Sequence, residues 1–191
     1  MVQKILETAR AIMREQGVAA LSMQELARRM ELRAPSLYHY FASKMEIYDS
    51  LFRLGFRLYG TQMDEILQEA PTWQEYVRIS FEGYLAFAKQ NPDLYQLCFE
   101  RPVPGFVPSE ESLRVSLQYL QKAYQKVAEF KQTIHSDLSP QQLVDLLITM
   151  MHGITAMHMS NEPGLPPGQG RFGSLIPASL DLLDKAWSKP A

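Results

Sequence analysis

The sequence contains very little cysteine and no long apolar segment. Cys98 is the only cysteine among 191 residues, so the chain can form no internal disulfide and has no cysteine pair for a structural zinc site. We read Cys98 as a buried small side chain, with a thiol sensor as the alternative. No run of about 18 apolar residues occurs, which predicts that no helix spans a membrane. Charged residues at positions 4, 7, 10 and 14 interrupt any apolar signal core. Together these absences favour a cytoplasmic bacterial protein.

Motifs that carry catalysis or hold cofactors are also missing. The sequence has no nucleophile elbow and no glycine-rich phosphate loop. His152 and His158 are separated by six residues, so they do not share one face of a helix, and the methionines around them are more typical of a core than of a metal site. We therefore expect no enzyme activity, no cofactor and no metal. A helical enzyme built on one of these histidines is kept as an alternative.

The whole chain has a small negative net charge, but its N-terminal third is positively charged. The net charge is −2. Residues 1–60 contain nine Lys or Arg and six Asp or Glu, which gives +3, whereas residues 61–191 contain ten and fifteen, which gives −5. A positive segment of this kind is what binding to phosphates requires.

Apolar residues recur with helical spacing along the chain, and no alternating strand pattern is present. The sequence predicts an all-α fold of about nine helices. The expected helices cover residues 3–16, 22–30, 35–40, 44–68, 73–90, 93–100, 109–132, 140–160 and 172–186. Two segments rich in proline and glycine, 101–108 and 161–170, are expected to be loops.

Residues 22–44 predict two short helices joined by a tight turn. Ser22 and Glu25 have the spacing of a capping box, and Pro35 suits the first turn of a second helix. Leu37 and Phe41 are the expected core residues of that second helix. Its polar and aromatic side chains are of the kinds that reach phosphates and base edges. This arrangement is a helix-turn-helix.

The same stretch closely resembles the DNA-binding region of the TetR family of bacterial transcriptional regulators. The resemblance is carried by Leu21-Ser22, Glu25-Leu26-Ala27, Leu32, Pro35-Ser36-Leu37-Tyr38, Tyr40-Phe41 and Lys44. Glu31 departs from the family pattern, because glycine is usual in that turn, and Arg33 replaces a small residue.

The resemblance implies a DNA-binding domain over residues 1–60, followed by an effector-binding and dimerisation domain over residues 61–191. It implies a homodimeric, ligand-responsive repressor that binds a palindromic DNA operator. The residues expected to contact DNA are Gln24, Arg33, Pro35, Ser36, Tyr38, His39 and Lys44. Arg28 and Arg29 are left open between DNA contact and a solvated face. A dimeric interaction module that no longer binds DNA is the alternative, because of Glu31.

The C-terminal part resembles the WHG subtype of the family, with Met151 in place of the tryptophan. A small apolar or aromatic effector is expected in a pocket lined by Phe81, Tyr84, Phe99, Tyr119, Met150 and His152. The last two long helices are expected to pair with their symmetry mates through Leu143, Leu147, Met150 and Ile154 on one helix and Leu175, Ala178, Leu182 and Leu183 on the other. The long fourth helix is the expected lever between effector and DNA, with Gly55 and Gly60 as bending points.

Overall fold

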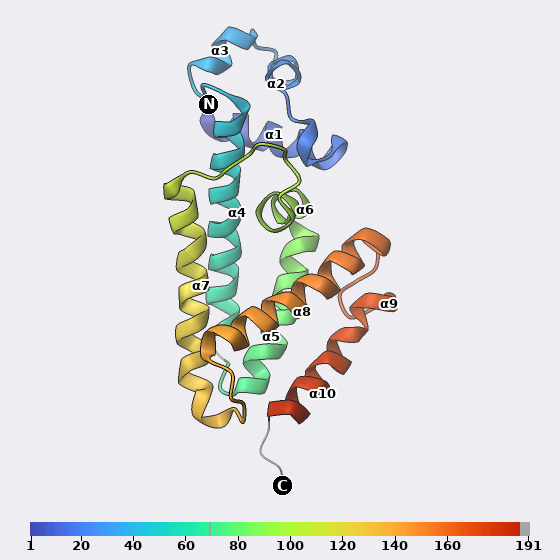
Figure 1. The fold of residues 1–191 in the computed structure, drawn as a ribbon. Helices are drawn as coiled ribbons and strands as arrows, with labels where there is room; N and C mark the ends of the chain where they lie inside the picture. Colours follow the sequence, from blue (N-terminus) through green and yellow to red (C-terminus); the bar gives the residue numbers. More distant parts are fainter. Residues whose placement is uncertain (69, 188–191) are drawn as a thin grey trace. The chain divides into compact units, whose positions relative to one another are not determined.

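The computed structural model describes residues 1–68 and 70–187, and its regular elements in this range are helices (Figure 1). The α-helices are α1 (Val2–Gln16), α2 (Met23–Arg29), α3 (Ala34–Tyr38), α4 (Lys44–Leu67), α5 (Trp73–Gln90), α6 (Pro92–Tyr95), α7 (Glu110–Phe130), α8 (Pro140–Asn161), α9 (Gly170–Gly173) and α10 (Leu175–Trp187). The prediction of an all-α fold is confirmed. None of the helices in the described part of the chain has the length and apolar content needed to cross a membrane.

Capping side chains begin several helices where the sequence predicts them. Ser22 Oγ accepts a hydrogen bond from the backbone N–H of Glu25 at 3.2 Å. Ser139 and Gln142 form a complete capping box at the start of α8. Ser43 and Glu46 also have capping-box spacing before α4, but there the Glu46 carboxylate accepts from the N–H of Ala42 at 2.8 Å. The contacts at α2 and α8 satisfy N–H groups that these helices leave unpaired, whereas the N–H of Ala42 lies before α4.

Two expected helices are divided in the structure. The one expected over residues 172–186 separates at Ser174 into α9 and α10 (Figure 1). Pro177 has no N–H to donate to the carbonyl of Gly173, so one continuous helix is interrupted here. The helix expected over 93–100 becomes α6 followed by a π-helix, Gln96–Glu100, which ends at Arg101 with φ 50° and an Arg101 N–H to Gln96 carbonyl bond of 3.0 Å.

The described residues form two compact units. The first unit contains residues 1–58 and 91–117. Within it, the Tyr48 hydroxyl donates to the Val18 carbonyl at 2.6 Å. Asp49 accepts from the backbone N–H of Ser109 at 2.7 Å and from the hydroxyl of Ser112 at 2.9 Å. Residues 91–117 therefore contact α4, and through α6 also α1, although they are distant from both in the sequence. The functional division at residue 60 stays a proposal.

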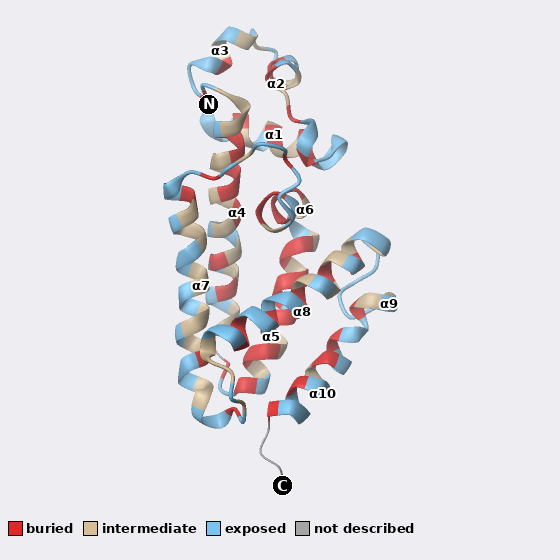
Figure 2. Cartoon of the chain, viewed as in Figure 1, coloured by how far each residue is buried: buried red, intermediate tan, exposed pale blue. Residues whose placement is uncertain are grey.

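The second unit contains residues 59–90 and the described residues from 118 onward. Helix α5 is buried along most of its length (Figure 2). An aromatic cluster closes one end of this unit: Trp73 has its ring centroid 5.6 Å from that of Trp187, 6.2 Å from that of Phe130 and 6.1 Å from that of Tyr76. Burial raises the pKa of Tyr76 to about 12. The two tryptophans of the chain thus report on the same unit.

The glycines of α4 allow close packing. A Cβ on Gly55 would lie 2.5 Å from Sγ of Cys98 in the first unit, and a Cβ on Gly60 would overlap the ring of Tyr119 in the second unit. Helix α4 continues through both positions. The sequence suggests bending points, whereas the structure gives each glycine a neighbouring side chain that occupies the space of its missing Cβ.

The turn between α2 and α3 yields a stability prediction. Glu31 is exposed and has φ 56°, in the left-handed region. Glycine at this position relieves about 1–2 kcal/mol of strain but costs roughly 0.5–1 kcal/mol in backbone entropy. We therefore expect Glu31→Gly to raise the free energy of unfolding by about 0.5 kcal/mol. Glu31→Val is expected to lower it. Urea unfolding at constant protein concentration measures both changes, with Arg101→Gly, at φ 50°, as a second site of the same kind. A glycine variant less stable than the wild type would contradict this explanation.

Candidate nucleic-acid interface

The second helix of the helix-turn-helix is held by two apolar anchors. Leu37 and Phe41 are buried, as the sequence predicts. Arg33 precedes α3 in an extended conformation, and Pro35 occupies the first turn. The Leu32 N–H bonds to the Ala27 carbonyl at 2.9 Å, which closes the turn onto α2. A helix of five residues is unstable alone, so this packing fixes its orientation.

The residues expected to contact DNA lie on the outer surface of the first unit. Tyr38 is 52% exposed and its neighbour Tyr40 is 46% exposed, so both rings are presented to solvent. The remaining expected residues are Gln24, Arg33, Pro35 and His39, which are exposed, and Ser36 and Lys44, which are half-buried (Figure 2). Aromatic, imidazole and hydroxyl groups are therefore presented by one short helix, α3, with an ammonium group at the start of α4.

The arginines of α2 are held by carboxylates of the protein itself. Glu25 bonds to Arg28 in a two-point contact, both distances being 2.8 Å, and to Nε of Arg29 at 2.8 Å. Arg29 also pairs with Glu15 at 2.8 Å. Hydrogen bonds from the two arginines lower the pKa of Glu25 to about 2. In contrast, Arg33 and Lys44 make no ion pair within residues 1–68 and 70–187. Their charges are available to phosphates.

The residues expected to bind an effector are only partly brought together. The Tyr84 hydroxyl lies 3.0 Å from Nδ1 of His152, and the ring of Tyr59 packs edge-on against Tyr84 with centroids 5.9 Å apart. Burial raises the pKa of Tyr59. Phe81 is buried and Met150 half-buried in this same unit.

Phe99 belongs to the first unit, where its ring lies 5.2 Å from that of Phe56 and 5.8 Å from that of Tyr95. Tyr119 packs over Gly60. Sequence spacing did not separate these two residues from the Tyr84–His152 pair. The reason is that the contacts of Phe99 and Tyr119 are made with α4 and α6, which local periodicity does not reveal.

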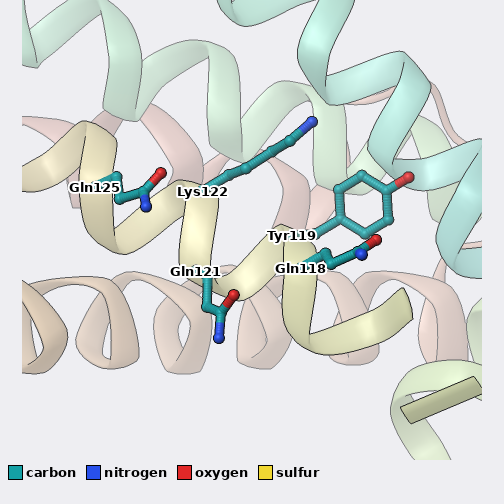
Figure 3. Close-up of a pocket in the computed structure, with 5 residues that line it drawn as sticks. All are labelled: Gln118, Tyr119, Gln121, Lys122 and Gln125. Carbon is teal, nitrogen blue, oxygen red and sulfur yellow. The ribbon is translucent and has the colours of Figure 1, made fainter. Parts of the chain in front are cut away.

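Helix α7 carries a polar depression that the sequence interpretation missed. It is lined by Gln118, Tyr119, Gln121, Lys122 and Gln125 (Figure 3). Lys122 pairs with Asp64 at 2.5 Å and lies 5.4 Å from the centre of the Tyr119 ring. The depression encloses about 220 Å³, below the roughly 300–1,000 Å³ of typical ligand pockets. Its amide lining does not match an apolar effector.

One face of α8 and one face of α10 carry apolar or small residues that are exposed or half-buried in the protomer. On α8, Leu146, Met150, Gly153 and Met157 are spaced by four, three and four residues and so share one face. On α10, Leu175, Ala178 and Leu182 do the same. We call these seven residues the α8–α10 stripe.

The stripe corrects the expected dimer surface. Leu143, Leu147 and Leu183 are buried within the protomer and are not available to a second copy. Leu175, Ala178 and Leu182 are exposed as the expectation requires, and Met150 and Ile154 are half-buried. An added Cβ at Gly153 would meet nothing within 4 Å, so the middle of the stripe is open in the protomer.

Within residues 1–68 and 70–187 there is no group of three or more histidine, cysteine, aspartate or glutamate side chains that could hold a metal ion.

Comparisons with known proteins match this geometry. Residues 5–51 match the family model described as bacterial regulatory proteins, tetR family. The HTH-type transcriptional regulator Rv1816 of Mycobacterium tuberculosis is 23% identical over 147 residues, which are 73% of this chain and 63% of the relative. The match therefore spans less than two thirds of that relative's length.

Solved structures resemble the whole described chain. FadR of Bacillus subtilis in complex with stearoyl-CoA has a TM-score of 0.74 at 16% identity, over 97% of this chain and 99% of that one. AibR in complex with isovaleryl coenzyme A and operator DNA has a TM-score of 0.71 at 16% identity, over 95% of this chain and 97% of that one. At such identities the likeness establishes the fold.

Proposed function

Because residues 5–51 belong to the tetR family of bacterial regulatory proteins, we propose that this chain is a ligand-responsive repressor of transcription that binds a palindromic DNA operator as a homodimer in the bacterial cytoplasm. The exposed side chains of α3 carry this proposal. Tyr38 and His39 stand out from a helix that Leu37 anchors, in the arrangement used to enter a major groove.

Each DNA-contacting residue has a role that its position suggests. Ser36, Tyr38 and His39 are on the helix that enters the groove, so they reach base edges and the nearest phosphates. Arg33 before α3, Lys44 at the start of α4 and Gln24 on α2 reach the flanking backbone. Two DNA-binding heads in a dimer read two half-sites about 34–36 Å apart, or a multiple of that distance. A hydroxyl-radical footprint on a bound fragment tests this, and a single unbroken protected segment would contradict a dimeric reader.

The α8–α10 stripe supplies the dimer surface in this proposal. Met157 is 46% exposed and Leu182 is 65% exposed, and both lie on faces otherwise lined by small or apolar residues. A two-fold axis places each stripe against its own copy, so four helices meet and the apolar side chains leave water. Gly153 gives the room for close approach.

The effector is proposed to be a small molecule with an apolar body and a polar group for the Tyr84–His152 pair. Two similar structures hold acyl thioesters of coenzyme A, stearoyl-CoA and isovaleryl-CoA. Acyl-coenzyme A compounds are therefore the first class to test. To lower operator affinity about a hundredfold, the effector must bind the released conformation more tightly than the DNA-bound one by roughly 2.7 kcal/mol. Helix α4 is the proposed lever between the two sites.

A thermal-shift series checks the effector proposal. Acyl-coenzyme A compounds of increasing chain length are added to the protein, and each stabilising compound is then titrated into the operator complex. We expect stabilisation to be accompanied by weaker operator binding, and Tyr84→Phe to reduce both effects by removing the hydroxyl that meets His152. Compounds that stabilise the protein but leave operator affinity unchanged would disprove the lever.

Lys44 yields a prediction that separates backbone contact from base reading. Lys44→Ala is expected to weaken all DNA sequences alike, by roughly 1–3 kcal/mol, and to reduce the salt dependence of binding by about one phosphate contact. His39→Ala instead is expected to alter sequence preference and leave the salt dependence nearly unchanged. Fluorescence anisotropy over a salt series measures both. If Lys44→Ala changed neither affinity nor salt dependence, the start of α4 would not meet the DNA backbone.

A further inference from the structure

An ion triad centred on the buried Asp93 joins α1, the first helix of the DNA-binding head, to α6. The Asp93 side chain is 0% exposed. Its carboxylate accepts from Nε and Nη2 of Arg10, at 2.6 and 3.2 Å, and from Nε of Arg14 at 2.8 Å. Nη2 of Arg10 also donates to the side-chain carbonyl of Asn91 at 2.9 Å. Two turns of α1 thus meet one carboxylate at the start of α6.

The carboxylate is charged in the folded protein. Burial opposes its ionisation, yet the hydrogen bonds from Arg10 and Arg14 together hold the pKa of Asp93 below its ordinary value. Both guanidinium groups are therefore paired with Asp93 inside the first unit.

Such a triad is better suited to orientation than to stability. Removing the Asp93 carboxylate and most of the Arg10 side chain from water is costly, while Arg14 stays 45% exposed. Apolar residues of similar volume often stabilise a protein as well or better. Apolar contacts have no preferred direction, whereas hydrogen bonds from guanidinium to carboxylate fix both distance and angle. Helix α6 has only four residues, and Arg10 and Arg14 add directional contacts to its fully buried anchors Leu94 and Tyr95.

We propose that Asp93 is a positioning residue for operator binding: by fixing α1 against α6, it sets the direction in which the DNA-binding head is presented, and so the half-site spacing that the dimer accepts. The proposal rests on the proposed function. A head that is free to turn still binds one half-site, because its contacts with DNA are made by other residues. It binds two half-sites at a fixed spacing less well, because the second head is no longer held at a high effective concentration near its half-site.

The test compares a single half-site with full operators whose two half-sites are moved apart or together by one base pair at a time. Asp93→Asn keeps the shape of the side chain and removes its charge. We expect its affinity for the native spacing to fall by about tenfold or more, its affinity for the single half-site to stay within about twofold of the wild type, and its preference for the native spacing to be lost.

A second variant separates positioning from stability. The pair Arg10→Met with Asp93→Leu replaces charge by apolar volume and is expected to keep the melting temperature while losing the spacing preference. Two controls leave the triad intact. Glu75→Gln removes a carboxylate paired with Arg78 in the second unit, and Val127→Ala lowers the stability of that unit. Both are expected to retain the preference for the native spacing.

The outcomes are distinguishable. If wild-type protein binds no operator, the proposed function itself fails. If wild-type protein binds and Asp93→Asn keeps the spacing preference, or loses single-site and full-site affinity by the same factor, the positioning role of Asp93 is overturned. Loss of the preference in Val127→Ala would also overturn it, because general destabilisation would then account for the effect.

Discussion

The double variant Met157→Asp with Leu182→Asp is expected to be a monomer and to lose at least about a hundredfold in operator affinity. In the wild-type protomer, Met157 and Leu182 are 46% and 65% exposed on the α8–α10 stripe. Burying such side chains contributes roughly 1.5–3 kcal/mol each, and the two-fold axis counts every residue twice. Four carboxylates at the same surface would have to be desolvated without partners, at several kcal/mol.

Operator binding falls with dimerisation because the two half-sites are no longer bound together. A linked second head acts at a high effective concentration, which a monomer lacks. Sedimentation velocity at micromolar concentration and anisotropy with the operator measure the two effects. Val107→Asp is the matched control, since Val107 is 79% exposed and belongs to the first unit rather than to α8 or α10, and this variant is expected to remain dimeric. A double variant that sediments as a dimer would place the interface elsewhere.

Gly60→Val is expected to lower the free energy of unfolding by about 3 kcal/mol. An added Cβ at this buried position would lie within 2 Å of two atoms of the Tyr119 ring, so the ring or the helix must move. Removing the ring makes room, so Tyr119→Ala in the same chain is expected to recover at least about 1 kcal/mol of that loss.

Urea unfolding followed by tryptophan fluorescence measures this coupling. Trp73 and Trp187 lie in the same unit as Gly60 and Tyr119, so their emission reports on the relevant part of the chain. All variants are compared at one protein concentration, because dimerisation shifts the midpoint. Additive effects of the two substitutions would show that Tyr119 does not limit the space at Gly60.

Local signals account for what the sequence predicts well. Ser22 with Glu25 and Ser139 with Gln142 begin their helices as capping residues, because a side-chain oxygen three residues before an N–H meets it in that geometry. Leu37 among polar neighbours identifies the buried face of α3. The resemblance supplied the DNA-contacting set, and the structure places Tyr38 on the surface as that role requires.

Contacts between distant segments account for what the sequence does not predict. Arg10 and Asp93 are 83 residues apart, and no local pattern pairs them. On α8 the apolar residues surround the helix, so periodicity alone gives no unique outer face, and Leu143 was assigned to the surface while Leu146 is the exposed neighbour. The break between α9 and α10 could have been predicted from Pro177, since a proline has no N–H to donate to the carbonyl four residues earlier.

Selection of random-sequence duplexes at low salt tests the central claim most directly. Wild-type protein is used beside the variant Tyr38→Ala with His39→Ala, which keeps the buried anchor Leu37. The claim that α3 of a dimer reads DNA predicts that the wild type enriches one inverted repeat with half-sites about one helical turn apart, and that the variant does not. No enriched repeat with the folded wild-type dimer would contradict it and would leave a dimeric interaction module in its place. An identical repeat enriched by the variant would contradict the assignment of α3.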